Sequence, residues 1–266
     1  MRADAVLLEA RGTTRRVART FALACRLLPG DVRDDVYRLY LVFRTLDDLV
    51  DEDDARAATA IAAVEEWVAD GRVRGREAGV LADLDRRHGL PRDALGDFCL
   101  GMRDDLEGAS LDTEDELDQY CYRVAGTVGV VMAAVLGTVD DERARPRAAA
   151  LGQAMQRTNI LRDIDEDGAN GRTYLARETL SRFGAPDPGL REALLRDQIA
   201  RADALYRKGM AGIALLRRGR HAVRAAAAMY REILRQIERE GYGARPGRAV
   251  VPRSRKLVVA ARALAP

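Results

Sequence analysis

The chain has 266 residues, of which 47% are hydrophobic and 32% are charged, a globular composition that excludes a disordered chain. Its 44 basic and 42 acidic residues leave a net charge of +2, so we expect no nucleic-acid partner. Only two histidines and three cysteines are present, and their spacing argues against a zinc site, a Ser/His/Asp triad and a disulfide framework. Carboxylates and arginines are left to carry any chemistry.

Apolar residues recur at helical spacing along almost the whole chain. This pattern predicts an all-α protein of about eight to ten helices, folded as a single domain over residues 1–266. The first ten residues contain Asp4 and Glu9 and no apolar segment, so we expect no signal peptide and a cytoplasmic protein. Turn signals separate the predicted helices at Pro29-Gly30, 71–79, 89–91, 108–113, Pro146, 168–172 and 184–189.

The first acidic helix is predicted over about residues 32–52. Asp47 and Asp51 are four residues apart on it, which places both carboxylates on one face, about 6 Å apart along the axis. Tyr40 and Arg44 precede them at turn spacing and complete a polar stripe. A single pair of this kind is typical of a solvated helix surface, so it does not indicate a site by itself.

The middle of the chain gives two weaker signals. Asp104 and Asp105 are adjacent and lack the four-residue spacing, so we interpret them as surface residues. The apolar run from Val124 to Gly137 falls short of the roughly 20 residues that a bilayer span needs. It therefore predicts a buried helix.

A second acidic helix is predicted over about residues 148–166 and repeats the geometry of the first. Asp163 and Asp167 form its pair, preceded on the same face by Asn159 and Gln156. Burying several carboxylates costs too much unless cations compensate, so two such pairs in apolar helices favour a cation site. Carboxylates one turn apart can hold Mg²⁺, which keeps several waters and also takes phosphate oxygens.

Basic residues dominate the tail after Glu240, where no acid occurs. Pro246 and Pro252 argue against one continuous helix there. We consider three interpretations of this tail: a solvated surface, a lid over a diphosphate that contributes Arg248, or a contact with anionic lipid.

The residues singled out above resemble the squalene/phytoene synthase family. The stretches that carry the resemblance, in the family's order, are Thr20–Ala24 with Leu27–Pro29, Asp47–Glu52, Tyr120–Gly129 and Thr158–Asp167. Gly171–Leu175 and residues 227–256 extend it over nearly the whole chain. Thr20 stands where the family usually has serine, and Ala176 stands where proline commonly follows.

The resemblance implies an isoprenoid synthase fold, in which helices surround a central cavity that takes two prenyl diphosphates. It implies bound Mg²⁺, with Mn²⁺ as the alternative ion. The implied metal-binding residues are Asp47, Asp51, Asn159, Asp163 and Asp167. The implied catalytic residues are Asp47, Asp51, Asp163, Asp167, Tyr40 and Arg44. The implied substrate-binding residues are Phe21, Tyr40, Arg44, Asp48, Val128, Gln156, Asn159, Arg162, Tyr230 and Arg248.

The implied reaction is metal-assisted loss of diphosphate from one substrate and attack by the double bond of the other. It passes through a cyclopropyl diphosphate to a head-to-head (1-1′) product. We favour phytoene from two geranylgeranyl diphosphates over a C30 product from farnesyl diphosphate, and expect NADPH only if the product is squalene. We also consider a divergent terpene cyclase and a non-catalytic helical partner in an isoprenoid assembly.

Small residues bear on the length of the prenyl chain. Cys25 lies one turn after Phe21, where a bulky residue would stop a tunnel; plain core packing is its second interpretation. Gly126 and Gly129 allow either close helix packing or room for a prenyl chain. Because the implied product is a hydrocarbon, we expect a peripheral contact with the inner membrane surface. The sequence does not predict the oligomeric state.

Overall fold

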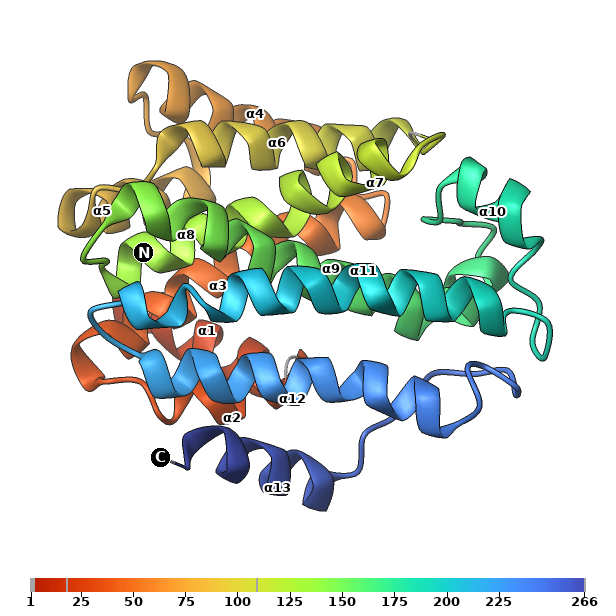
Figure 1. Cartoon of the computed structure of the whole chain (residues 1–266). Helices are drawn as coiled ribbons and strands as arrows, with labels where there is room; N and C mark the ends of the chain where they lie inside the picture. Colours follow the sequence, from red (N-terminus) through yellow and green to blue (C-terminus); the bar gives the residue numbers. More distant parts are fainter. Residues whose placement is uncertain (1–2, 18, 109, 266) are drawn as a thin grey trace.

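The structure is a computed structural model that describes residues 3–17, 19–108 and 110–265. Within these residues no strand occurs, and the predicted all-α class is confirmed (Figure 1). The helices of the N-terminal half are α1 (Ala3–Val17), α2 (Arg19–Cys25), α3 (Gly30–Asp51), α4 (Ala57–Asp70), α5 (Gly75–His88), α6 (Arg92–Glu107), α7 (Glu114–Cys121), a π-helical turn (Tyr122–Gly126) and α8 (Thr127–Leu136). Those of the C-terminal half are α9 (Asp141–Ala169), α10 (Arg177–Phe183), α11 (Glu192–Met210), a 3-10 turn (Ile213–Leu215), α12 (Arg220–Arg239) and α13 (Arg253–Leu264).

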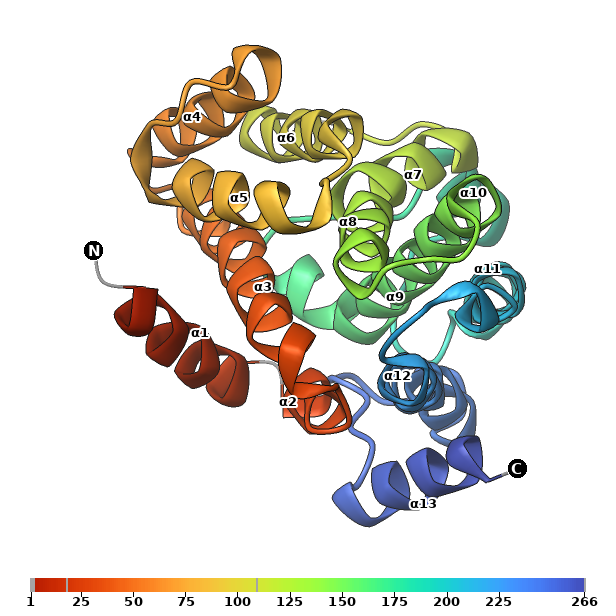
Figure 2. The same cartoon turned by 90° about the vertical axis from the view of Figure 1, so that its left-hand side faces the viewer.

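Long helices surround the centre of the molecule. Helices α3, α8, α9, α11 and α12 enclose it, while α4, α5 and α6 form a layer on one side (Figure 2). Helix α1 packs against α3 from outside, and α13 packs against α12 at the far end from α4 (Figure 2). An apolar cavity lies between α2, α3, α8, α9 and α12.

Helix α3 begins after Pro29, whose extended ψ of 145° brings the chain into the first turn. Leu39, Val42 and Leu46 recur at helical spacing and are almost fully buried, so this face packs into the core. The polar stripe lies beside this face, and the helix ends at Asp51, one residue from the predicted end. Its position in the core explains how aspartates come to be held next to apolar surroundings.

Helix α9 is longer than predicted, because Pro146 lies inside it rather than at a break. The helix begins at the N-cap Asp140, whose carboxylate accepts a hydrogen bond of 3.0 Å from the Arg143 N–H. Pro146 is exposed and lies within the first two turns. We attribute its tolerance to this position, because water can solvate the carbonyl that loses its partner.

The stretch Glu114–Leu136 is continuous helix through α7, the π-helical turn and α8. It is the one helix in the described ranges that is long and apolar enough to cross a membrane, by length and composition only, and half of its most apolar window is buried. A Cβ added at Gly129 would collide with the Ala148 carbonyl of α9, so the two helices are in close contact. The predicted buried helix over 124–137 is confirmed.

Short elements account for the remaining differences from the predicted pattern. More helices occur than the roughly ten expected, because α2 and α10 have only seven residues each and periodicity does not resolve them. Helix α7 begins where expected, with a capping box formed by Thr113 and Glu116. The basic tail has no continuous helix, as predicted: residues 241–252 are irregular, and α13 begins after Pro252.

Candidate active site

The two aspartate pairs lie on different helices and approach each other at one end of the cavity. Asp47 and Asp51 are on α3, and Asp163 and Asp167 are on α9. Arg172 connects the two walls: its backbone N–H donates to the Asp167 carbonyl at 2.9 Å, and its side chain contacts Asp51 at 3.2 Å. The doubled spacing in the sequence thus corresponds to a pair of neighbouring acidic walls.

The environment of the α3 wall disfavours the ionised form of Asp47. Burial and, after it, the charge of Asp51 raise the pKa of Asp47 to about 6, although Arg44 opposes the rise. The Arg44 guanidinium contacts Asp47 at 2.8 Å and also pairs with Asp48. Arg44 therefore offsets part of the negative charge of both Asp47 and Asp48.

The α9 wall has the same character. Burial is the largest cause that raises the pKa of Asp167 to about 6. The charges of Asp163, Glu166 and, across the site, Asp51 contribute to the same rise. Arg162 binds Asp163 through two contacts of 2.5 and 2.8 Å, and Arg248 reaches the same carboxylate at 2.8 Å. Arginines thus contact both aspartates of the α3 pair and Asp163 of the α9 pair. The site combines carboxylates with cations suited to a diphosphate.

Polar side chains connect the acidic end to the cavity. Asn159 accepts a hydrogen bond of 3.2 Å from the Tyr230 hydroxyl and donates one of 3.2 Å to Gln156. Tyr40 packs against Phe21, with ring centroids 5.0 Å apart, and burial raises the pKa of its hydroxyl to about 12. These predicted residues lie between the carboxylates and the apolar lining.

The donor set fits a divalent ion whose coordination is completed from outside. Among the described residues, no three His, Cys, Asp or Glu side chains are grouped closely enough to hold an ion alone. Mg²⁺ is usually bound by one or two carboxylates together with waters and substrate phosphates, which is what each aspartate pair offers. The pKa values of Asp47 and Asp167 are raised by burial first and by neighbouring carboxylates second, and a bound cation would favour the ionised form of both.

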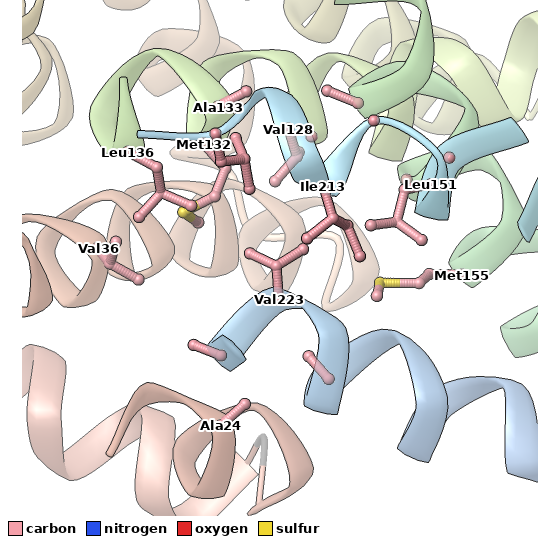
Figure 3. A pocket seen from close by; sticks show the side chains of 18 of the residues that line it. Ala24, Val36, Val128, Met132, Ala133, Leu136, Leu151, Met155, Ile213 and Val223 are labelled. Carbon is pink, nitrogen blue, oxygen red and sulfur yellow. The ribbon is translucent and has the colours of Figure 1, made fainter. Parts of the chain in front are cut away.

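The apolar cavity has a volume of about 290 Å³ (Figure 3). Its labelled side chains come from α2, α3, α8, α9, α12 and the 3-10 turn, and converge on one space (Figure 3). Phe21 and Val128, both predicted, line it, and so do Cys25 and Gly129. Gly129 serves both interpretations given above, since it lines the cavity and also allows α8 to contact α9.

The cavity and the carboxylates follow each other along both helices. On α3 the lining residue Val36 precedes Asp47 by about 16 Å, and on α9 Met155 precedes Asp163 by about 12 Å, at 1.5 Å per residue. An extended apolar chain with an anionic head therefore has a matching site, with its tail in the cavity and its head between the walls.

Asp105 belongs to this site, and its interpretation as a surface residue was wrong. The Tyr120 hydroxyl donates to its carboxylate at 3.3 Å, and Tyr120 stacks on Tyr174 with centroids 5.5 Å apart. Burial and, after it, the charges of Asp47 and Asp51 together raise the pKa of Asp105 to about 7. The signal was available, since Asp105 follows the buried residue Met102 by three positions on α6.

Asp105→Asn is expected to stabilise the metal-free protein at alkaline pH. The folded-state pKa of Asp105, about 7, exceeds its ordinary value of 3.8, so its contribution to stability is full below pH 4 and is lost as the pH rises through 7. At pH 8.5 the variant should gain roughly 2–4 kcal/mol in unfolding free energy, and at pH 4 almost nothing. Urea unfolding at both pH values measures this; an equal gain at both would contradict it.

A buried arginine fixes the segment that carries Arg248. The Arg191 side chain is 2% exposed and binds Asp165 through contacts of 2.5 and 2.7 Å. Asp165 also accepts a hydrogen bond of 2.6 Å from the backbone N–H of Gly247, the neighbour of Arg248. A Cβ at Gly243 would collide with the Arg191 guanidinium. Local sequence patterns did not indicate these contacts, because they join segments far apart in the chain.

Arg191→Met is expected to raise the KM for the substrate about tenfold, because Arg248 loses the support of its segment. Arg248→Gln should raise the KM at least as much. The double variant should have the same KM as Arg248→Gln alone, because both changes remove the same contact, that of Arg248 with Asp163. Steady-state kinetics of the three variants, with thermal unfolding as a control, test this, and fully additive effects would contradict it.

Comparison with known proteins places this site in a family. The family model described as squalene/phytoene synthase matches residues 14–255. The chain belongs to this family. A phytoene synthase from Arthrospira platensis is 36% identical over 93% of this chain and 89% of its own length, and one from Thermus thermophilus is 38% identical over 84% and 80%.

Solved structures of squalene/phytoene synthase relatives agree with the fold. A crystal structure of a dehydrosqualene synthase in complex with a ligand has a TM-score of 0.88 at 26% identity, covering 98% of this chain and 95% of its own. A squalene synthase from Alicyclobacillus acidocaldarius has a TM-score of 0.78 at 26% identity, covering 90% and 95%. The predicted family and isoprenoid synthase fold are confirmed, and as a member of this family the chain is a prenyltransferase.

Proposed function

We propose that the chain catalyses Mg²⁺-dependent head-to-head (1-1′) condensation of two prenyl diphosphates through a cyclopropyl diphosphate. The observation that carries this is the pair of acidic walls at the end of the apolar cavity. Asp47 and Asp51 would hold Mg²⁺ on one wall, and Asp163 and Asp167, supported by Asn159, on the opposite one. The bound ion would supply positive charge that stabilises the negative charge of the leaving diphosphate.

The chain's own residues have separate tasks in this proposal. Arg44, Arg162 and Arg248 offer guanidinium groups that can bind diphosphate oxygens bidentately. Tyr40 and Tyr230 orient the head group at the boundary with the cavity. Apolar walls exclude water, so an allylic cation meets the second double bond before water quenches it.

We favour phytoene as the product, from two geranylgeranyl diphosphates. The phytoene synthases cited above are 36% and 38% identical to this chain, while the solved dehydrosqualene synthase is 26% identical. Cys25 in the cavity wall is small and leaves room for the longer chain. A C30 product from farnesyl diphosphate is the second candidate, supported by the TM-score of 0.88 to that structure, and NADPH would be used only for squalene.

The test is a product assay. The purified protein is incubated with Mg²⁺ and either geranylgeranyl or farnesyl diphosphate, and the extract is analysed by mass spectrometry. A C40 hydrocarbon from the first substrate supports the proposal, and a C30 product from the second alone supports the alternative. A C20 or C15 cyclic product would show a divergent cyclase. Absence of diphosphate release with both substrates would indicate a non-catalytic partner.

We further infer that residues 1–266 act as one domain in the cytoplasm. Both walls of the site need helices from the two halves of the chain, α3 and α9, and the family match runs from residue 14 to 255. The hydrocarbon product is insoluble in water, so we include a peripheral contact with the inner membrane surface in the proposal.

A further inference from the structure

A second, larger cavity lies on the outer side of α2. Phe21 and Cys25 of this helix face the apolar cavity, while Leu23 and Arg26 line the outer one. Helices α1 and α3 and the start of α13 complete this space, whose volume is about 940 Å³. It is separate from the acidic site, and we call it the basic groove.

The basic groove is positively charged. Five of its lining residues are cationic, and no carboxylate lines it; the five are Arg11, Arg26, Arg33, Arg253 and Lys256. Arg11 is paired with Asp34 at 2.7 Å, and Lys256 donates to the Thr20 hydroxyl at 3.0 Å. Within residues 3–17, 19–108 and 110–265, none of Arg26, Arg33 and Arg253 lies within ion-pair distance of a carboxylate. Three guanidinium groups are therefore available to an anionic ligand.

Apolar side chains border the groove and point to solvent. Val250 is 66% exposed and Leu257 is 57% exposed, and both line the groove. Val258, next on α13, is 47% exposed, and no residue of α13 is fully buried. Exposed leucine and valine beside arginines are typical of a helix that lies in a membrane interface. A nucleic acid would neutralise the arginines and leave these side chains in water.

Helix α13 also packs on part of the wall of the apolar cavity. Ala260 and Leu264 of α13 pack on a small buried cluster between α2 and α12. Two members of that cluster, Ala24 and Ala226, line the apolar cavity as well. In Figure 2, α13 lies below α2 and α12, on the side away from α4 and α5. Ala24 and Ala226 therefore contact the cavity on one side and belong to the cluster that α13 covers on the other.

We propose that the basic groove and the outer face of α13 form a docking surface for an anionic lipid bilayer. Arg26, Arg33 and Arg253 bind lipid phosphates, while Leu257 and Val258 enter the boundary of the acyl chains. We call the buried cluster between α2 and α12, which contains Ala24 and Ala226, the α2–α12 seam. Docking places this seam next to the membrane, so the hydrocarbon has a short route from the cavity into the bilayer. The docking surface specifies the peripheral membrane contact included in the proposed function, and the exit route rests on the proposed reaction.

Vesicle co-sedimentation without substrate tests the docking surface. The full chain should bind vesicles that contain both phosphatidylglycerol and phosphatidylcholine, and it should dissociate from them at about 0.5 M salt. It should not bind vesicles of pure phosphatidylcholine. The triple variant R26Q/R33Q/R253Q should bind about 100-fold more weakly, and L257S/V258S about tenfold more weakly. A charge-matched control, R72Q/R74Q/R86Q with V73S, alters the region of α4 and α5 and should bind like the parent.

Three results would overturn the proposal. They are equal binding by the triple variant and the parent, equal binding to both vesicle types, and full competition by millimolar inorganic diphosphate, which would make the groove a site for a free anion. Thermal unfolding checks that the variants are folded, which is expected because Arg33 is half-buried and the other changed side chains are exposed. Failure of the product assay would leave vesicle binding intact, so the two failures are distinguishable.

A turnover assay then tests the exit route. In detergent micelles the triple variant should match the parent, because none of its three arginines lies in the acidic site. With anionic vesicles as the only acceptor, its multiple-turnover rate should fall about tenfold while its single-turnover rate stays unchanged. Equal multiple-turnover rates for the two proteins would exclude this seam as the route of release.

Discussion

Asp47→Asn and Asp167→Asn are each expected to lower turnover by about 1,000-fold or more, equivalent to roughly 4 kcal/mol of transition-state stabilisation. Each change removes one carboxylate from a pair that would hold Mg²⁺ against the departing diphosphate. The fold should survive, because both aspartates have a pKa near 6 and their charge opposes folding at neutral pH. At pH 8, without metal, both variants should therefore unfold at or above the parental temperature.

The measurement is diphosphate release at several Mg²⁺ concentrations. Apparent Mg²⁺ affinity should weaken in both variants, and in the parent it should rise with pH through 6 as the carboxylates lose their protons. Asp83→Asn on α5 is the matched control, since it removes an aspartate that contacts Arg86 and Arg87 and should change neither turnover nor Mg²⁺ activation. Parental activity in Asp47→Asn would exclude Asp47 from the site.

The two acidic helices could be predicted because their signals are local. A run of apolar residues at 3.6-residue spacing predicts a core helix over 32–52, and the structure begins and ends this helix within two residues of that range. The four-residue spacing then fixes which side chains share a face. That the two faces meet came from the family resemblance, because spacing along one helix carries no information about its neighbours.

The features that were predicted wrongly or missed depend on tertiary contacts. Pro146 was interpreted as a break, because the rule for proline describes the middle of a helix and takes no account of an exposed early turn. Asp105 was placed on the surface because the adjacent pair Asp104-Asp105 lacks the four-residue spacing. In the structure Asp104 pairs with Arg123, while Asp105 accepts a hydrogen bond from Tyr120. The contact between Arg191 and Asp165 spans 26 residues, and no local pattern identifies such a partner.

Cys25→Phe is expected to convert a C40 enzyme into a C30 enzyme. Cys25 is 1% exposed and lines the cavity, and burial raises the pKa of its thiol to about 12, so the side chain stays neutral and apolar. A phenyl ring there would occupy part of a cavity of about 290 Å³ and shorten the space for the prenyl tail. We expect C40 formation to fall by about 100-fold or more, since a tail that does not fit costs several kcal/mol.

The ratio of products separates this effect from simple damage to the core. Farnesyl diphosphate is five carbons shorter, so its conversion to a C30 product should be retained or increased in Cys25→Phe. Cys25→Ala is the control, because it enlarges the cavity and should leave the C40 product dominant. If Cys25→Phe instead lowers both activities equally and also lowers the unfolding temperature, the residue is ordinary core, and overpacking explains the loss. The length of the hydrocarbon would then be set by other residues of the cavity wall, to which Leu136 and Ile213 belong (Figure 3).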